Sequence, residues 1–244
     1  MRRWQPIAIT IKPLTVAGML LLAAPTQAGT LSNDWTYAID SFTDGTEGSI
    51  VGETSAFEFY ALAFKQTSDR LFFAISSNLP LDGYPNPSAR NGAVNYSDLF
   101  LNFTTPEFAS ANGNLVGIRF DSKNDTTLGL GVYNNVTAIS LSSENTGYSS
   151  LADYNTQVAL SGGTVGYADG TAAYFDSTQP AYTTIATGNF IGEVTPEFNL
   201  AELGLDFGAV GAVGSQIFGF SVAKNIFPSG GFIANVLLNA ATMA

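Results

Sequence analysis

Carboxylates and hydroxyls are the side chains with which this sequence could do chemistry. Its 244 residues contain neither histidine nor cysteine, against 20 aspartates and glutamates. A Ser–His or Cys–His nucleophile and a His/Cys zinc site are therefore excluded. The glycine-rich phosphate-binding motif with its lysine is also absent from the sequence. What remains is carboxylate chemistry, either acid–base catalysis or the binding of a hard cation.

Two acidic residues lie in apolar runs, where a carboxylate is unusual. A glycosidase needs two carboxylates roughly 5–10 Å apart across a sugar, one of them often with a raised pKa. Glu58 is inside an aromatic run, and Asp98 enters a second apolar run and is its candidate partner. The simpler interpretation has Glu58 pointing to solvent at a sheet edge and Asp98 capping a turn. We favour it, and we predict that the protein is not an enzyme.

Two loops carry clusters of oxygen ligands that would suit calcium. Calcium takes six to eight oxygens from carboxylates, amide side chains and loop carbonyls. The candidate ligands are Asp40, Asp44 and Glu47 in one loop and Asp121, Asn124 and Asp125 in the other. Neither cluster has EF-hand spacing, and solvated turn residues are the simpler interpretation of both. Calcium is nevertheless the one cofactor that the sequence indicates, with the first loop preferred because it directly precedes the central strands.

Aromatic residues give a third kind of candidate site. A carbohydrate-binding β-sandwich presents exposed Trp or Tyr rings with amides nearby, whereas most aromatic side chains simply pack in a core or a loop. The candidates are Trp35, Tyr84, Tyr96, Tyr133 and Tyr148. Tyr84 lies in a loop rich in proline and glycine, so we expect it to be the most exposed of the five.

The strands that must position these side chains are clearest over residues 57–79. With period two, the first run places Tyr60, Leu62 and Phe64 on one side. The polar link 66–69 separates it from a second run of the same kind. Two such runs across a short polar link predict an antiparallel hairpin. Because both faces are largely apolar, we expect central strands with a second layer packed over them.

The rest of the chain follows the same pattern of short strands. A helical turn is predicted at 149–156, and a short helix at 197–203 with Thr195 as its cap and Pro196 in its first position. Further strands are predicted at 34–42, 96–103, 115–120, 129–134, 136–142, 214–224 and 232–238, with two short edge strands between 158 and 188. This spacing indicates an all-β protein, one antiparallel β-sandwich or jelly-roll-like domain over residues 29–244.

Residues 1–28 have the order of regions found in a secretory signal peptide. Basic Arg2, Arg3 and Lys12 precede an apolar run at 14–24, and small residues predict cleavage after Ala28. A permanent membrane anchor is the alternative, but the run is shorter than the roughly 18–20 residues that a spanning helix needs. We therefore expect a secreted protein of the periplasm, cell surface or extracellular space.

Removal of the signal peptide leaves six basic and 20 acidic residues, a net charge of −14. Such a surface repels nucleic acid and anionic lipid and favours cation binding. Without cysteine there are no disulfides, so burial and hydrogen bonds must hold the fold together in an oxidising compartment.

Several strings of residues resemble the secreted surface proteins that cyanobacteria make in association with exosortase. They are residues 35–45, 71–81, 96–103 and 207–220. Members with a sorting tail carry a Val-Pro-Glu-Pro-like motif, an apolar span and terminal basic residues. Residues 232–244 have neither that motif nor a basic end, so the resemblance does not extend to exosortase processing. It implies an extracellular or envelope-associated protein and no particular chemistry.

The sequence thus predicts a secreted, non-enzymatic β-sandwich of the cell envelope or extracellular matrix. Its expected partners are an envelope or matrix polysaccharide or other copies of itself, not nucleic acid and not a membrane that it spans. A carbohydrate-binding module is the first alternative. A β-sandwich glycosidase that uses carboxylates such as Glu58 is the second.

Overall fold

The hairpin predicted over residues 57–79 is confirmed and lies inside one of two large sheets. In this computed structural model, strands β6 (Phe59–Gln66) and β7 (Arg70–Ser77) pair antiparallel. All residues at 59–64 and 71–77 are buried, as expected for strands covered on both faces. The structure describes residues 7–11, 30–47, 50–104, 107–142, 145, 147–165, 174, 178 and 182–238.

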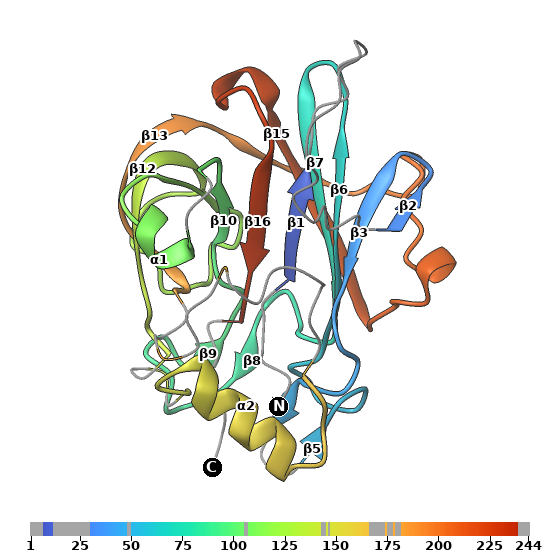
Figure 1. Cartoon of the computed structure of the whole chain (residues 1–244), viewed down its shortest axis with the longest axis vertical. Helices are drawn as coiled ribbons and strands as arrows, with labels where there is room; N and C mark the ends of the chain where they lie inside the picture. The colour runs from blue at the N-terminus through green and yellow to red at the C-terminus, as the bar shows by residue number, and fades with distance from the viewer. Residues whose placement is uncertain are drawn as a thin grey trace, which may run out of the picture.

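Two six-stranded antiparallel sheets face each other, which confirms the all-β sandwich (Figure 1). Sheet B has the order β14 (Val194–Glu197), β15 (Gln216–Ala223), β7, β6, β3 (Trp35–Ile39) and β2 (Thr30–Ser32). Sheet A has the order β1 (Ile7–Ile11), β16 (Phe232–Val236), β10 (Leu99–Asn102), β11 (Leu115–Arg119), β12 (Gly131–Ile139) and β13 (Thr184–Gly192). Strands β10 to β13 follow one another as a meander.

Smaller elements cover the ends of the sandwich. The short strands are β4 (Thr46–Glu47) with β5 (Ile50–Val51), and β8 (Tyr84–Pro85) with β9 (Ala93–Val94). The helices are α1 (Phe108–Ala111), α2 (Leu151–Leu160) and the 3₁₀ turns η1 (Gly208–Val210) and η2 (Lys224–Ile226). Helix α2 lies at the lower end of the sandwich, opposite the β6–β7 turn (Figure 1).

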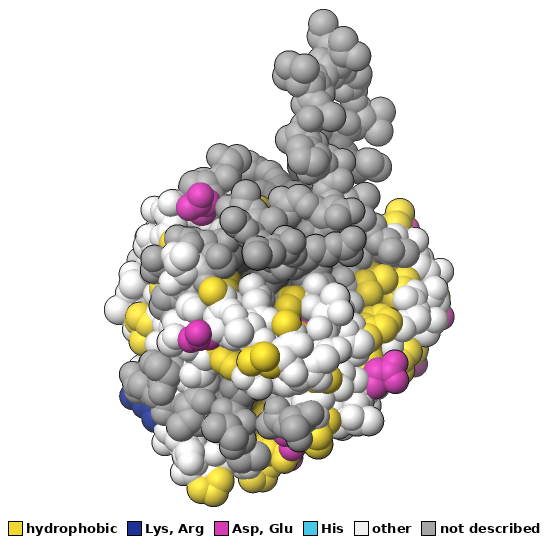
Figure 2. All heavy atoms as spheres, turned by 60° about the horizontal axis from the view of Figure 1, so that its bottom comes forward, with side chains coloured by type: hydrophobic (Ala, Val, Ile, Leu, Met, Phe, Trp, Pro, Cys, Tyr) yellow, Lys and Arg dark blue, Asp and Glu magenta, His cyan; other side chains and the backbone are white. Residues whose placement is uncertain are grey.

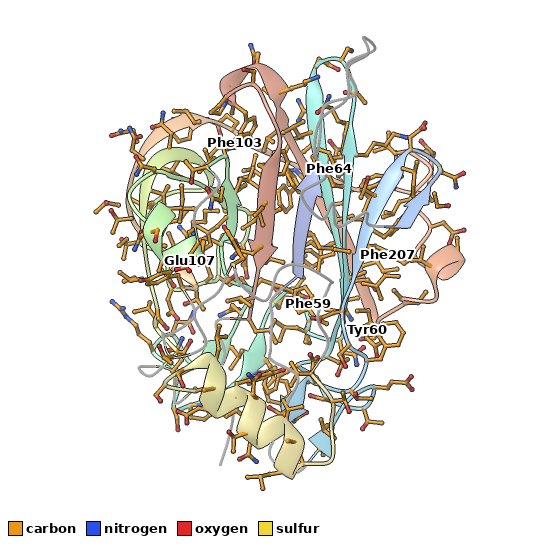
Figure 3. All side chains as sticks on the ribbon, in the orientation of Figure 1. Phe59, Tyr60, Phe64, Phe103, Glu107 and Phe207 are labelled. Carbon is orange, nitrogen blue, oxygen red and sulfur yellow. The ribbon has the colours of Figure 1, made fainter. Side chains whose placement is uncertain are left out.

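Apolar side chains form a core between the sheets and further clusters on their outer faces. Leu62, Phe73 and Ile75 of sheet B share the central core with residues of sheet A. Tyr60 and Phe207 belong instead to a cluster on the outer face of sheet B. Figure 3 shows this division, with Phe59 and Phe64 between the sheets and Tyr60 and Phe207 on the outer side. The period-two alternation of the strands thus determines which side chains enter which cluster.

Helix α2 begins where the sequence predicts a helical turn, and it is longer than predicted. The Ser150 side chain caps it by accepting a hydrogen bond from the Asp153 N–H at 3.1 Å. The strands predicted at 129–134 and 136–142 are instead one strand, β12. Asn135 has φ of 50° within it, and the register with β13 shifts nearby. The residue that separates the two predicted strands therefore marks a local irregularity within β12 and not a turn.

The helix predicted at 197–203 is wrong. Residues Val194–Glu197 form the edge strand β14, where Pro196 faces Phe220 of β15. Proline is tolerated there because an edge strand leaves one row of N–H groups unpaired. Two edge strands were also expected between 158 and 188, where α2 runs to Leu160 and β13 begins at Thr184. Much of the segment between them lies outside the described residues.

Part of the segment predicted to be a removable leader forms a strand. Ile7–Ile11 make up β1, which pairs with β16 at the edge of sheet A and lies against β3 and β6 of sheet B. Over the part of the chain that the structure describes, no helix is long and apolar enough to cross a membrane.

Candidate functional site

Glu58 is fully buried just before β6 and is the first of three neighbouring carboxyl groups. Its Oε2 accepts a hydrogen bond from the Gly45 N–H at 2.9 Å, while its Oε1 has no hydrogen-bond partner. Burial, followed by the charge of nearby Asp44, raises the pKa of Glu58 to about 8. The expectation that Glu58 points to solvent at a sheet edge is therefore wrong.

Asp40 and Asp44 complete this acidic centre, which we define as Asp40, Asp44 and Glu58. Desolvation, then Asp44, and more weakly Glu58, raise the pKa of Asp40 well above its usual range. The hydroxyl of Tyr154 on α2 donates to the backbone carbonyl of Asp44. Like charges held together in a low dielectric disfavour ionisation, so the pKa values of Asp40 and Glu58 are both raised.

Two of the three carboxyl groups of the acidic centre are buried, and Asp40 is partly exposed. Both Asp44 and Glu58 are buried. Figure 2 shows the end of the molecule that carries α2, and the acidic side chains visible there are scattered singly. A Cβ at Gly45 would lie 2.5 Å from the N and Cα of Glu58. Glycine is therefore needed at position 45, because a side chain there would keep the loop from approaching the backbone of Glu58 so closely.

Glu47, the third predicted calcium ligand of this loop, has other partners. Its Oε1 accepts a hydrogen bond from the Tyr84 hydroxyl, and its Oε2 accepts one from the Ala56 N–H at 3.1 Å. The structure thus places Asp40 and Asp44 with Glu58 and not with Glu47. Within the described ranges, no group of three or more acidic, His or Cys side chains is arranged to hold a metal ion. Calcium binding stays a prediction from sequence.

Asp98 is the centre of a buried hydrogen-bond network. It accepts from Asn124 Nδ2 at 2.8 Å, from the Ile185 N–H at 2.7 Å and from the hydroxyl of Thr126. Burial raises its pKa to about 6, although these hydrogen bonds and the charge of Arg119 oppose the shift. The solvent-facing turn cap expected of Asp98 is therefore wrong, because this carboxylate ties a loop to β13.

The second predicted calcium cluster is divided among several partners. Asn124 faces Asp98, and its Oδ1 accepts from Arg119 Nε at 3.0 Å. Asp125 accepts from the side-chain amide of Asn145 at 2.7 Å, and Asp121 accepts from the Lys123 N–H at 2.7 Å. These contacts stabilise the loop after β11.

The carboxylates considered for a glycosidase do not line an open cleft. Glu58 and Asp98 are both 0% exposed. Each is held by backbone or side-chain donors of its own surroundings, Glu58 by Gly45 and Asp98 by the network around Asn124. A sugar positioned between two carboxyl groups needs both of them accessible, and neither is.

The aromatic residues that the sequence offers as carbohydrate-binding candidates pack against other parts of the protein. Trp35 and Tyr96 are fully buried. The Trp35 Nε1–H donates to the Leu203 carbonyl at 3.0 Å, and the Tyr96 hydroxyl donates to a backbone carbonyl of the core. Half-buried Tyr84 packs edge-on against Phe57, with ring centroids 5.1 Å apart.

The remaining two rings have similar surroundings. Tyr133 is buried, and Tyr148 packs edge-on against Tyr154 at 5.1 Å. Three of the five rings, Trp35, Tyr96 and Tyr133, are therefore too deeply buried to stack on a sugar, whereas Tyr84 and Tyr148 are partly exposed.

A cavity of about 720 Å³ opens at the end of the sandwich opposite α2. It lies between the β6–β7 turn and the connection from β15 to β16. Aromatic Phe103, Phe227 and Phe232 contribute to its wall together with two cations, Arg70 and Lys224. Phe103 stacks on Phe227 at 6.1 Å, and Figure 3 shows Phe103 at this upper end.

Hydroxyl and carbonyl oxygens are the hydrogen-bond partners that the structure gives to the two cations of the cavity. Arg70 Nε donates to the Ser221 hydroxyl at 2.8 Å, and Lys224 Nζ has a single long contact, 3.4 Å, to the Thr67 carbonyl. Neither forms an ion pair within the described part of the chain. A guanidinium and an ammonium that form no ion pair can bind the oxygens of a carboxylate or a sulfate.

The sequence did contain a signal for this cavity. Basic residues are rare, only nine in 244. Arg70 begins β7 and Lys224 directly follows β15, and these two strands are paired. Arg70 lies opposite Ala223, the residue before Lys224, in the β7–β15 register. Only that pairing brings the two cations together, and the sequence pattern does not specify which strands are neighbours.

The chain matches no protein-family model, and no curated protein or solved structure is significantly similar to it. The resemblance to exosortase-associated surface proteins therefore stays a prediction.

Proposed function

We propose that this chain is a secreted, non-enzymatic protein of the cell envelope or extracellular matrix that binds an acidic polysaccharide. The binding site in this proposal is the cavity beside Arg70 and Lys224. The observation that carries it is that, among the residues the structure describes, no carboxylate forms an ion pair with either of these two cations, although the chain has more than twice as many acidic as basic residues.

The cavity suits a sugar that carries an acid group. Arg70 is held in place by Ser221, whose own hydroxyl donates to Glu197, so its orientation is fixed before a ligand arrives. Phe103 and Phe227 supply apolar surface for the C–H face of a sugar ring. Because the protein as a whole is strongly negative, the favoured ligand is a chain end with one or two acid groups and not a long polyanion.

Binding without hydrolysis agrees with the state of the carboxylates. The two acidic side chains that a glycosidase would use, Glu58 and Asp98, are 0% exposed. Neither belongs to the wall of the cavity. A ligand in the cavity would therefore meet two cations, phenyl rings and the single carboxylate of Asp69, without the carboxylate pair that glycoside hydrolysis requires.

Titration calorimetry with a short oligo-uronate tests this proposal. We expect binding to the oligo-uronate and none to a neutral oligosaccharide of equal length. Lys224→Gln should weaken binding about tenfold, since it removes a charge-assisted contact. The matched control is Lys123→Gln, which removes an equal charge from an exposed lysine that pairs with Asp82 instead.

Equal affinity in the Lys224 and Lys123 variants would place the ligand elsewhere. Release of reducing sugar from the oligo-uronate would contradict the non-enzymatic assignment. The proposed location has its own measurement, in which the N-terminal sequence of the protein recovered from culture medium or envelope should begin at Gly29.

A further inference from the structure

Strand β16 has neighbours on both of its edges, and one of them is the predicted leader. On one side it pairs with β10. On the other it pairs with β1 over five residues, from Ile7 opposite Val236 to Ile11 opposite Phe232. The ladder is antiparallel and has no shift in register.

Strand β1 also closes the gap between the two sheets. It lies against β3 and β6 of sheet B, whose side chains Ala38, Leu62 and Phe64 belong to the central core and are nearly or fully buried. Phe64 in turn packs edge-on against Phe232 of β16, with ring centroids 5.4 Å apart. The segment is thus seated in a groove one strand wide, between the edge of β16 and the inner faces of β3 and β6.

Cleavage after Ala28, as in the proposed function, would remove this strand. Backbone N–H and C=O groups of Phe232–Val236 would then lose their partners on one side, and apolar surface of β3 and β6 would be uncovered. An open sheet edge beside an apolar surface is a template for strand addition.

We infer that the groove of the processed protein binds an extended segment of another protein as an added strand, antiparallel to β16. This inference rests on the proposed removal of residues 1–28. The segment that fills the groove within the chain defines the chemistry of the partner: the pattern Ile-Ala-Ile-Thr-Ile, with basic residues on either side. Basic flanks complement the net charge of −14 on the rest of the chain.

A second copy of the folded chain does not fit this groove. The strand that it would offer, its own β16, is fixed in a sheet by β10 and cannot enter a space one strand wide. The occupant is therefore a free, extended segment.

The test uses the secreted protein that begins at Gly29 and a synthetic peptide with the sequence of residues 2–13. We expect the peptide to bind and to raise the melting temperature. An Ile9→Pro peptide should bind at least about tenfold more weakly, because proline lacks the N–H and disfavours a paired strand.

Because the chain has no cysteine, a disulfide can trap the register. Ile9 lies opposite Ala234, so an Ile9→Cys peptide should cross-link to an Ala234→Cys protein under mild oxidation. The matched control is Ile233→Cys, whose side chain points to the other face of the sheet. It should not cross-link.

The remaining outcomes distinguish failure of the groove proposal from failure of the proposed function. A secreted protein that begins at Gly29, remains folded and does not bind the peptide overturns the groove and leaves the proposed function intact. Self-association through position 234 without peptide overturns the choice of occupant. A secreted protein that retains residues 7–11 overturns both the removal of the leader and the open groove.

Discussion

The carboxylate of Glu58 accepts a hydrogen bond from the Gly45 N–H at 2.9 Å, and its other oxygen has no partner. This contact fastens the loop after β3 to the start of β6. It also leaves a carboxyl group that is most stable when protonated, since burial and Asp44 both oppose its ionisation. The fold therefore carries an electrostatic cost at neutral pH that a neutral side chain at this position would avoid.

The free energy of unfolding should decrease as pH rises from about 4.5 to about 8. The pKa of Glu58 is near 4.5 when unfolded and about 8 when folded, so within this window the folded state holds the proton that the unfolded state has lost. Glu58→Gln should flatten the slope and stabilise the protein at pH 7.5 by about 2–3 kcal/mol. Urea denaturation at pH 5 and 7.5 measures both effects. Glu202→Gln, an equal charge change at an exposed residue, is the control, and an equal slope in both variants would contradict the assignment.

Gly45→Ala should destabilise the fold by about 2–3 kcal/mol. The added Cβ would lie 2.5 Å from backbone atoms of Glu58 and 2.6 Å from the carbonyl carbon of Phe57, and backbone atoms cannot rotate away. Thermal melting checks the effect. Gly129→Ala is the matched control, since its Cβ would approach nothing closer than 3.8 Å. If the two variants have the same melting temperature, the loop does not pack on β6 as described.

Asp98→Ala should cost about 3–5 kcal/mol, because it leaves buried donors of Asn124, Thr126 and Ile185 without an acceptor. Faster hydrogen exchange at the Ile185 amide should accompany the loss, since that N–H donates to Asp98. Asp82→Ala removes the carboxylate of an exposed ion pair with Lys123 at 3.0 Å and should cost less than about 1 kcal/mol. Equal costs in the two variants would show that Asp98 is not a buried tether.

Phe73→Ala should cost about 3–5 kcal/mol by leaving a cavity between the sheets. Phe73 is fully buried, stacks on Phe220 at 5.5 Å and contacts Phe64 at 5.3 Å between centroids. Phe198→Ala is the control, because that ring is 90% exposed and its removal should change stability little. Denaturant titration of both variants distinguishes core packing from a general effect of losing a phenyl ring.

The strands were predictable where a period-two pattern coincides with turn residues, as over residues 57–79. The pattern failed at residues 194–203, because Thr195 and Pro196 suit both a helix start and an edge strand. Their pairing with Ser221 and Phe220 decides between the two, and that pairing is a tertiary contact. Local preference alone cannot reveal it.

The sequence predicts which types of residue could form a site, but it predicts much less well which of these residues lie together in the folded protein. The sequence pattern places Asp40 and Asp44 with Glu47 because all three lie in one loop, yet the chain folds so that Glu58 is their neighbour and Glu47 accepts a hydrogen bond from Tyr84. Hydrogen bonds from a loop to a strand depend on how closely the backbones approach, and Gly45 permits that approach. Trp35 and Tyr96 show the same limit for aromatic residues, since a sequence does not say which face of a ring is covered.

The place of β16 in sheet A bears on the order in which the chain can fold. This strand comes from residues 232–236, yet it pairs with β10 and with β1, which precede it by well over a hundred residues. The sheet cannot be completed during synthesis until residues 232–236 have emerged from the ribosome. Such long-range closure makes folding slow. Completion of sheet A is therefore expected to be a late step in folding, after the strands of its β10–β13 meander have been made.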